Sequence, residues 1–234
     1  MWPIPDYSDE LVAIVLNPHS LILSWITPIK NTHSYFQLNA YQNIQLSTLD
    51  FQHGIINNPS NIKKHIGQFL STHKIKHANI CFALTNPTVY ERIVTTGHAT
   101  PLKSDLSDLE SNMHIIESIY LYAQENTFIF YTCAIKHEQL LQFQSLAIAT
   151  QLNLRRITTQ NSACLQLYAF IKGNHFLHTQ LGLDLAQNKN EIFNLINTTQ
   201  LHSYLKMNTA QKIDFEQESH NLKISLGIAI SHFV

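Results

Sequence analysis

Fourteen histidines are the most frequent side chains in this chain of 234 residues that could ligate a metal or carry a proton. A zinc site needs histidine, cysteine or acidic ligands at short, characteristic spacings. His175 and His178 are the one histidine pair with two residues between them. A single pair is a weak signal, and the scatter of the other histidines through loops and helix faces indicates a polar surface. The sequence therefore predicts no metal site.

Three cysteines are the next candidates for chemistry, and they lie far apart, at Cys81, Cys133 and Cys164. None belongs to a Cys-x-x-Cys pair, and each falls inside an apolar strand or helix. Such thiols behave as small buried hydrophobes, and their odd number is typical of a reducing compartment. The sequence also has no nucleophile elbow, zinc-protease helix or Walker loop. We therefore expect no hydrolase chemistry.

Composition excludes several classes of partner. Hydrophobic residues make up 44% of the chain, which indicates a globular protein. The net charge is −1 and no basic run is longer than two residues, so nucleic-acid binding has no electrostatic support. Met1–Asp9 lacks the basic start of a signal peptide. Leu11–Ile29 has the length of a membrane span, but the polar turn Asn17–Ser20 in its middle favours two short strands instead.

The elements that must position these residues begin with three strands. We predict them at Leu11–Leu16, at Leu21–Ile26 and from Ser34 through Leu38 towards Leu46. A helix should follow with Ser60 as its N-cap. Its apolar face should consist of Ile62, Ile66, Phe69 and Leu70, and its polar face of Lys63, Lys64 and Gln68.

Strands and helices alternate in the middle of the chain. We predict strands at Ala78–Leu84, Val89–Thr95 and Thr127–Ile135, and helices at Asp105–Gln124 and Lys136–Gln151. The first of these helices is predicted from an apolar stripe, Leu109, Met113, Ile116 and Tyr120. The second carries Leu140, Leu141, Phe143, Leu146 and Ala147.

Further strands and helices are predicted in the last third of the chain. A strand begins at Leu152–Ile157, and a helix over Asn161–Phe170 ends near Gly173. Three more strands and a closing helix are then expected at Thr179–Leu185, Glu191–Ile196, Gln200–Lys206 and Leu222–Phe233.

This order of elements resembles the PilM family, the actin-fold proteins of type IV pilus assembly. Over Gln52–Thr96 the order is a glycine with two aliphatic residues, a polar loop, a helix, a basic linker and two strands. It is similar to the start of that family's inserted subdomain. Lys136–Glu138 and Leu152–Ile157 also stand where the family pattern expects them, and Leu222–Phe233 matches its closing helix at Gly227. The length is closest to the short, HofM-type relatives of DNA uptake, and FtsA is a more distant relative.

The resemblance implies a fold and a division into domains. The fold would be α/β, an actin-like (ribonuclease H-like) duplicated fold with an inserted αβ subdomain and a truncated second half. Residues 1–60 and 158–174 would form the first half, 61–157 the inserted subdomain, and 175–234 the truncated half with the closing helix. Met207–Glu218 would replace a whole subdomain, and that segment is too short to form one.

The resemblance also implies a degenerate nucleotide site. In the family, the first hairpin turn and an aspartate after the second half's first strand hold the nucleotide and its metal. Asn17, His19, Ser20 and Asp184 stand at those positions. The turn has neither glycine nor lysine, and Pro18 offers no N–H to a phosphate. We therefore expect no catalysis and no resident cofactor, and the alternative is an ATPase of the actin-like superfamily that binds Mg-ATP.

A binding function follows from the same resemblance. PilM-like proteins bind the cytoplasmic N-terminal tail of PilN, a membrane-spanning pilus protein, partly by strand addition. The chain would then be a non-catalytic cytoplasmic adaptor of a type IV pilus or competence complex, held at the inner membrane by its partner. We place the tail near Leu84, Tyr90, Glu91 and Arg92, beside the helix expected over Asp105–Tyr120. Self-association remains open.

Overall fold

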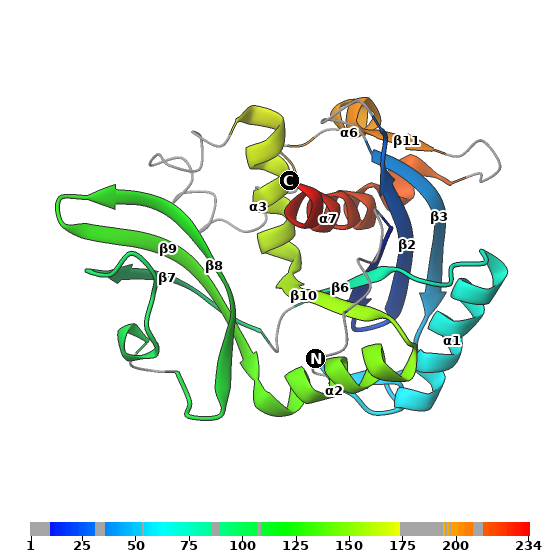
Figure 1. The fold of residues 1–234 in the computed structure, drawn as a ribbon, viewed down its shortest axis with the longest axis horizontal. Coiled ribbons are helices and arrows are strands. Elements are labelled where there is room, and N and C mark those ends of the chain that lie inside the picture. The colour runs from blue at the N-terminus through cyan, green and yellow to red at the C-terminus, as the bar shows by residue number, and fades with distance from the viewer. Residues whose placement is uncertain are drawn as a thin grey trace.

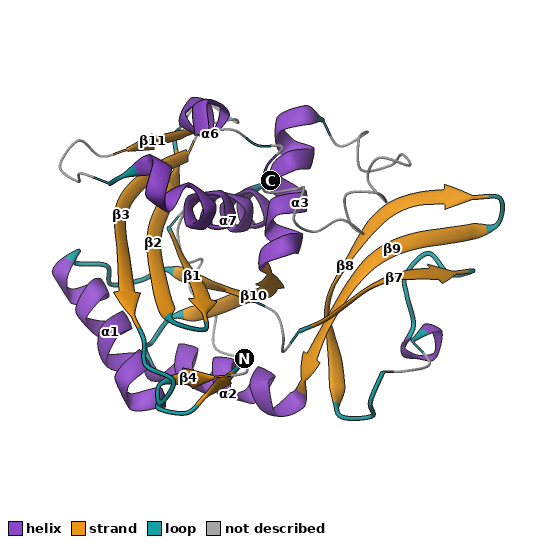
Figure 2. Cartoon of the chain, turned by 180° about the vertical axis from the view of Figure 1, so that it is seen from behind, coloured by secondary structure: helices purple, strands orange, loops and turns teal. Residues whose placement is uncertain are grey.

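The structure is a computed structural model that describes residues 10–30, 36–52, 54–85, 89–106, 109–173, 194, 196, 198–207 and 213–234. A central sheet with helices packed on it forms one part, and a smaller, curved sheet extends to one side (Figure 1). Figure 2 shows the same two parts from behind. Within the described residues, no helix is both long and apolar enough to cross a membrane.

The central sheet has six strands in the order β10-β6-β1-β2-β3-β11. Its three central strands read as near-continuous apolar runs because both of their faces are covered. The first three strands form an antiparallel meander, β6 and β10 run parallel to β1, and β11 runs parallel to β3. Their bounds are β1 Leu11–Asn17, β2 Ser20–Pro28, β3 Phe36–Gln45, β6 Asn79–Leu84, β10 Asn153–Thr159 and β11 Leu205–Met207. The predicted three-strand start is confirmed.

Helices cover both faces of this sheet. On β6, Asn79 contacts His232 of α7, whereas the ring of Phe82 packs on Phe143 of α2 with 5.0 Å between the ring centroids. Side chains three positions apart on a strand point to opposite faces, so α7 and α2 lie on opposite sides. The helix bounds are α1 Pro59–Thr72, α2 His137–Ala149, α3 Gln160–Lys172, α6 Thr198–Tyr204 and α7 Phe215–Phe233.

The first helix carries the buried face that the sequence predicts, but a different residue caps it. Ile62, Ile66, Phe69 and Leu70 are buried. The Ser60 cap is wrong, because the side-chain oxygen of Asn58 accepts the backbone N–H of Asn61 at 3.2 Å. Pro59 then occupies the first helical position, where no N–H is needed.

The smaller sheet contains the largest difference from the sequence prediction. It has three antiparallel strands in the order β7-β9-β8, with bounds β7 Tyr90–Thr96, β8 Met113–Gln124 and β9 Thr127–Lys136. The helix predicted over Asp105–Gln124 is wrong. Asp105, the first residue of the predicted helix, is the last residue of a short 3-10 helix, η1 Lys103–Asp105. From Met113 to Gln124 the chain forms β8, which pairs with β9 along most of its length.

An irregular strand pattern in β8 accounts for the error. The register against β9 shifts between Ile115 and Glu117 and again between Tyr120 and Tyr122. Each bulge adds one residue and breaks the strict alternation of a strand. Met113 and Ile116 stand three positions apart across the first shift, and together with Leu109 and Tyr120 they imitate the period of a helix.

The predicted inserted subdomain, residues 61–157, is wider than this second sheet. β6 and most of β10 fall inside that range, yet they pair with each other in the central sheet, with β6 next to β1. Only β7, β8 and β9 form the separate sheet. A hairpin of two short strands, β4 Phe51–Gln52 and β5 Ile55–Ile56, follows β3 in the chain and precedes α1.

The second predicted three-strand start is described only at its end. Thr179–Leu185, with Asp184, lies outside the described residues, as does most of Glu191–Ile196. The strand predicted over Gln200–Lys206 is wrong for most of its length, because α6 occupies Thr198–Tyr204 and buries Leu201 completely. Only Leu205–Met207 is a strand, so the duplication of the fold stays a prediction.

Candidate functional site

The carboxyl ends of the parallel strands β1, β6 and β10 meet at one edge of the central sheet, where open α/β sheets commonly bind ligands. Asn17 ends β1, Thr85 follows β6, and Gln160 follows β10 as the first residue of α3. The predicted degenerate nucleotide site falls here, except for Asp184, which lies outside the described residues.

Polar groups of the β1–β2 turn bond to one another, to Leu46 after β3 and to Gln160 of α3. The side-chain amide of Asn17 donates to the hydroxyl of Ser20 at 3.0 Å, and its oxygen accepts from the amide of Gln160. The backbone carbonyl of His19 accepts the N–H of Leu46 at 2.8 Å. The structure therefore brings Asn17, His19 and Ser20 together, in a turn held by its own side chains.

A row of side chains crosses the three-stranded sheet at the same edge. Glu91 of β7 and Glu117 of β8 both lie opposite Cys133 of β9. This row, Glu91–Cys133–Glu117, faces the end of β10 and the start of α3. The amide of Asn161 donates to Glu91 at 2.9 Å, and the Cys133 sulfur lies 3.8 Å from the hydroxyl oxygen of Thr159.

Glu117 makes the strongest contacts of the row. Its carboxylate accepts from the hydroxyls of Thr158 and Ser162 and forms an ion pair with Arg156. The Glu117 side chain is 3% exposed, so the carboxylate is buried. Negative charge is favourable at a helix N-terminus because the first N–H groups lack intrahelical partners. The start of α3, which could attract an anion, instead has carboxylates of the chain's own second sheet beside it.

The residues predicted to bind a partner lie in two different settings. Leu84 is 1% exposed and pairs with Leu16 on one side and Thr159 on the other, inside the central sheet. Arg92 is exposed and donates to the hydroxyl of Tyr90 at 3.0 Å. Tyr90, Glu91 and Arg92 are therefore neighbours on β7, whereas Leu84 faces no solvent.

The cysteines are buried, as the sequence predicts. Burial raises the pKa of the Cys81 thiol to about 12, with Arg156 opposing the shift, and raises the pKa of Cys133 well above its usual value. Such thiols carry little thiolate at neutral pH. His175 and His178 lie outside the described residues, and no three potential metal ligands gather within the part of the chain that the structure describes.

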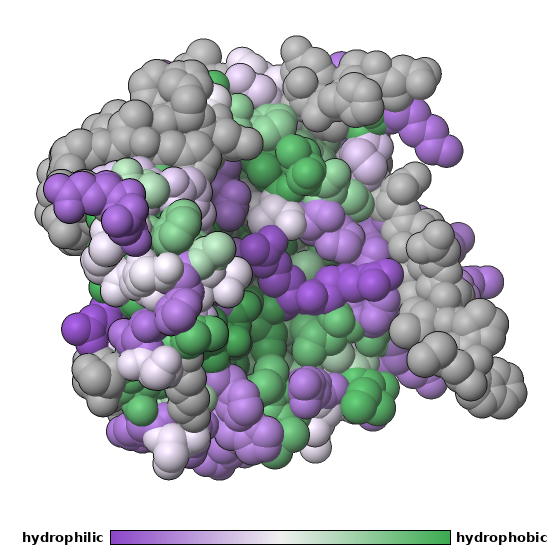
Figure 3. Space-filling view, turned by 60° about the vertical axis from the view of Figure 1, so that its left-hand side comes forward, coloured by the Kyte–Doolittle hydropathy of each residue, from purple (hydrophilic) through white to green (hydrophobic). Residues whose placement is uncertain are grey.

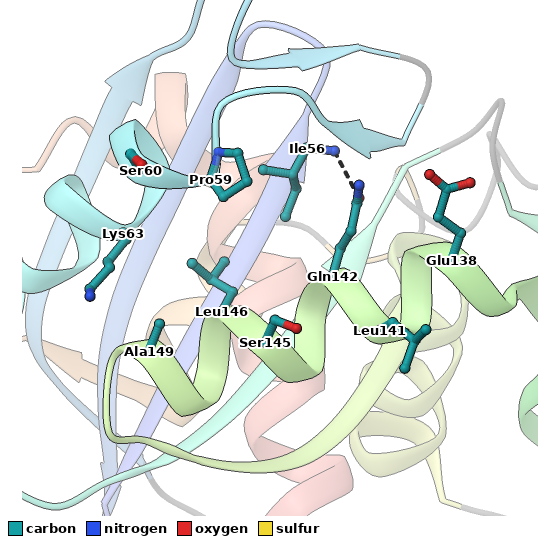
Figure 4. Close-up of a pocket in the computed structure, with 10 residues that line it drawn as sticks. All are labelled: Ile56, Pro59, Ser60, Lys63, Glu138, Leu141, Gln142, Ser145, Leu146 and Ala149. Carbon is teal, nitrogen blue, oxygen red and sulfur yellow. Dashed lines mark hydrogen bonds between the residues drawn. The ribbon is translucent and has the colours of Figure 1, made fainter.

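A concave surface that the sequence did not predict lies elsewhere, between α1 and α2. This α1–α2 groove has a volume of about 500 Å³, within the range of small-ligand and peptide pockets. Figure 4 shows residues of α1, α2 and the neighbouring β5 along it. Its lining consists of Ile56, Pro59, Ser60, Lys63, Glu138, Leu141, Gln142, Ser145, Leu146 and Ala149.

Two glutamines of α2 fix the groove's shape. Gln139 is 3% exposed, donates to the carbonyl of Gly54 at 3.1 Å and accepts the N–H of Lys136 at 3.0 Å. One turn further along, the side-chain oxygen of Gln142 accepts the backbone N–H of Ile56 at 3.0 Å (Figure 4). The β4–β5 hairpin is therefore tied to α2 at two points.

The groove is apolar in its middle and charged at its ends. Ile56 and Leu146 are each 3% exposed and form its floor, whereas Leu141 is 47% exposed on its wall. Lys63 and Glu138 lie at opposite ends (Figure 4). An extended segment with apolar residues in its centre and opposite charges at its two ends fits this surface.

Exposed apolar side chains gather around the same elements. Leu49, Ile55, Leu141 and Ile148 come from the loop before β4, from β5 and from α2. By contrast, the face seen from the side of the three-stranded sheet shows apolar patches broken by hydrophilic side chains (Figure 3). The groove is thus the better candidate for contact with a partner.

Asp50 holds the loop before β4 against the start of α1, and this contact predicts a pH dependence. Its carboxylate accepts from the hydroxyl of Ser47 at 2.7 Å and from the amide of Asn61 at 2.8 Å. These bonds, the Ser47 hydroxyl foremost, lower the pKa of Asp50 in the folded chain. The stabilisation is therefore present above the unfolded pKa of about 3.9 and is lost as pH falls through the folded pKa.

We expect Asp50→Asn to lower the urea midpoint at pH 7. Between neutral and acidic pH, the midpoint of this variant should fall less than that of the native chain. Urea titrations over that range, with Glu110→Gln at an exposed position as control, measure both effects. Parallel curves for Asp50→Asn and the native chain would contradict the assignment.

Comparison with known proteins supports the fold. Searches of protein-family models and of curated protein sequences find no match. Among solved structures, a chain of the PilM-PilN type IV pilus biogenesis complex superposes with a TM-score of 0.57 at 14% identity, covering 69% of this chain and 50% of that chain. The protein thus spans about half the length of that chain. The actin-like α/β fold class is confirmed.

Two further similarities are weaker. The cytoplasmic domain of EpsL, an inner-membrane component of the Vibrio cholerae type II secretion system, has a TM-score of 0.41 at 8% identity, over 66% of this chain and 58% of that one. Thermus thermophilus RuvC has a TM-score of 0.44 at 10% identity, over 95% and 92% of the two chains. We draw no conclusion from these two.

Proposed function

We propose that the protein is a non-catalytic adaptor of a type IV pilus or DNA-uptake complex and binds the N-terminal tail of a PilN-like membrane protein. The observation that carries the proposal is the α1–α2 groove on a fold shared with a chain of a PilM–PilN complex. The protein would lie in the cytoplasm, at the inner membrane through this partner.

The groove favours a short peptide over a folded domain. Its volume is about 500 Å³, its floor of Ile56 and Leu146 is apolar, and Lys63 and Glu138 supply opposite charges at its ends. A tail in this groove would place a basic group near Glu138 and an acidic group near Lys63. Burial of one or two aliphatic side chains on the floor would supply about 1.5–3 kcal/mol each.

The absence of catalysis is part of the same proposal. The polar groups of the Asn17–Ser20 turn bond to each other and to Gln160, and Glu91 and Glu117 lie beside the start of α3. A triphosphate brought to this edge would meet two carboxylates where a phosphate cradle needs donors. A clear rise in melting temperature with Mg-ATP would contradict this part of the proposal.

Leu141→Glu is expected to weaken tail binding at least tenfold. The substitution places a charge on the apolar wall and removes its aliphatic contact, each worth about 1 kcal/mol or more. The probe is a fluorescein-labelled peptide copying the N-terminal cytoplasmic tail of the PilN-like protein from the same genome, and anisotropy gives its Kd. Gln144→Glu is the matched control because this residue, on the same helix, is exposed and outside the groove lining.

The same titration tests the site predicted from the sequence. Arg92→Glu should leave the Kd unchanged if the tail occupies the groove. Weaker binding by Arg92→Glu together with unchanged binding by Leu141→Glu would place the tail on β7 and reject the groove. No binding by the native chain would reject the adaptor proposal as a whole.

A further inference from the structure

The backbone of β5 presents one donor towards α2 instead of towards its hairpin partner. In the β4–β5 hairpin, Phe51 lies opposite Ile56 and Gln52 opposite Ile55. In an antiparallel ladder, only alternate pairs exchange backbone hydrogen bonds. The N–H of Ile56 donates to the side chain of Gln142, so Phe51 and Ile56 form the pair that does not exchange bonds. The outer edge of β5 therefore opens into the α1–α2 groove.

The side chain of Gln142 accepts the hydrogen bond of the Ile56 N–H, as a backbone carbonyl of another strand would. Its side-chain carbonyl is an amide oxygen, chemically the same acceptor as a peptide carbonyl, at a normal distance of 3.0 Å from the Ile56 nitrogen. Ile56 is 3% exposed, and an unsatisfied N–H at that depth would be costly. Unpaired strand edges also tend to recruit other chains. Gln142 thus saturates the one donor that an incoming strand would use.

We infer that Gln142 is a built-in competitor for the partner's backbone: the bound tail pairs with β5 as an added strand, and its carbonyl displaces the Gln142 side chain from the Ile56 N–H. The inference rests on the proposed function, because it takes the tail as the occupant of the groove. It names the binding mode and the residue that sets the affinity. Gln139, deeper and bonded at both ends, keeps α2 in place during the exchange.

The competition predicts an affinity gain on removing the side chain. In Gln142→Ala, the free protein loses one hydrogen bond that the bound state does not contain. A net hydrogen bond corresponds to about a threefold to tenfold change in Kd. We expect Gln142→Ala to bind the labelled tail peptide about threefold to tenfold more tightly than the native chain. Gln144→Ala, an exposed position two residues along the same helix, should leave the Kd unchanged.

Amide hydrogen exchange at Ile56 provides a second readout. We expect slow exchange in the free native chain, faster exchange in free Gln142→Ala, and slow exchange in both proteins with the tail peptide bound. Peptides N-methylated at one residue each test the strand pairing on the native chain alone. Affinity should fall at the residue opposite Ile56 and change little at its two neighbours, whose N–H groups point the other way.

The outcomes separate the two proposals. Failure of the native chain to bind the peptide rejects the adaptor function. Binding to the native chain, with an unchanged or larger Kd for Gln142→Ala, rejects the displacement of Gln142 alone. A uniform loss across the N-methylated series would show that the tail does not pair with β5, even if Gln142→Ala did not fold.

Discussion

Replacing Gly227 by alanine is expected to destabilise the fold by about 3 kcal/mol or more, the upper end of the cost of overpacking a core. Gly227 lies in the middle of α7, where that helix crosses α3. A Cβ at this position would stand 2.0 Å from the carbonyl oxygen of Ala163 and 2.6 Å from its carbonyl carbon. Both are backbone atoms of α3, so no rotamer change relieves the clash and the two helices must separate.

Separation of the two helices would open the core of the central sheet. The α7 side chains on both sides of Gly227 are buried: Leu222, Ile224, Leu226, Ile228 and Ala229. A loss of 3 kcal/mol is a large share of the roughly 5–15 kcal/mol by which such domains are stable. Equilibrium urea unfolding followed by circular dichroism measures the change.

Gly67→Ala is the matched control. Gly67 is exposed in the middle of α1, and a Cβ there meets nothing within 4 Å. Alanine favours a helix over glycine by about 1 kcal/mol, so this variant should be more stable than the native chain. An unfolding midpoint for Gly227→Ala equal to the native one would show that α3 and α7 do not approach as closely as described.

The sequence predicts the inner strands of the central sheet because burial alone decides them. The apolar run of β1 continues from Leu11 to Leu16, and all six residues of β6 are buried. Such runs need no knowledge of a distant partner. The failure at β8 has the opposite cause: pairing with β9 decides the strand, and the bulge between Ile115 and Glu117 disturbs its alternating pattern.

The α1–α2 groove could not be predicted from the sequence, because it also depends on contacts between distant segments. Its walls come from α1 and from α2, segments that lie far apart in the chain and meet only in the fold. One signal was present. On the predicted α2 helix, Leu141 falls away from the face formed by Phe143, Leu146 and Ala147, and the structure leaves it 47% exposed. A single exposed apolar residue is common on helices, so this signal points to a contact surface only together with the apolar neighbours that the fold brings beside it.

The polar row at the second sheet also left no pattern to find. Glu117 stands in an apolar run, and a buried acid on a strand is predictable only when its partners are known. Those partners, Arg156, Thr158 and Ser162, lie about forty residues later on β10 and α3. The row of carboxylates became visible only when the strand register placed Glu91 and Glu117 opposite the same Cys133.

Glu117→Gln is expected to destabilise the fold by about 3 kcal/mol, the lower end of the range for removing one partner of a buried ion pair. The substitution keeps the size of the side chain but replaces one acceptor oxygen by a donor. The hydroxyls of Thr158 and Ser162 and the guanidinium of Arg156 then share a single oxygen. Arg156 is 29% exposed and can gain some water, which holds the cost at the lower end.

The position of Glu117 makes the effect local as well as global. Glu117 ties β8 to β10 and α3, so its loss should loosen the three-stranded sheet before the central sheet opens. We expect hydrogen exchange in β7, β8 and β9 to quicken more than exchange in β1 and β6. Glu125→Gln, an exposed position just after β8, should change neither exchange nor the urea midpoint.

A double substitution separates the ion pair from simple packing. If the penalty comes from an uncompensated Arg156, then Glu117→Gln combined with Arg156→Gln should be less destabilised than the sum of the two single variants. Additive losses would show that the two side chains act independently. A urea midpoint of Glu117→Gln equal to that of the native chain would show that apolar contacts hold the second sheet on α3. The Glu117 carboxylate would then contribute nothing measurable to stability.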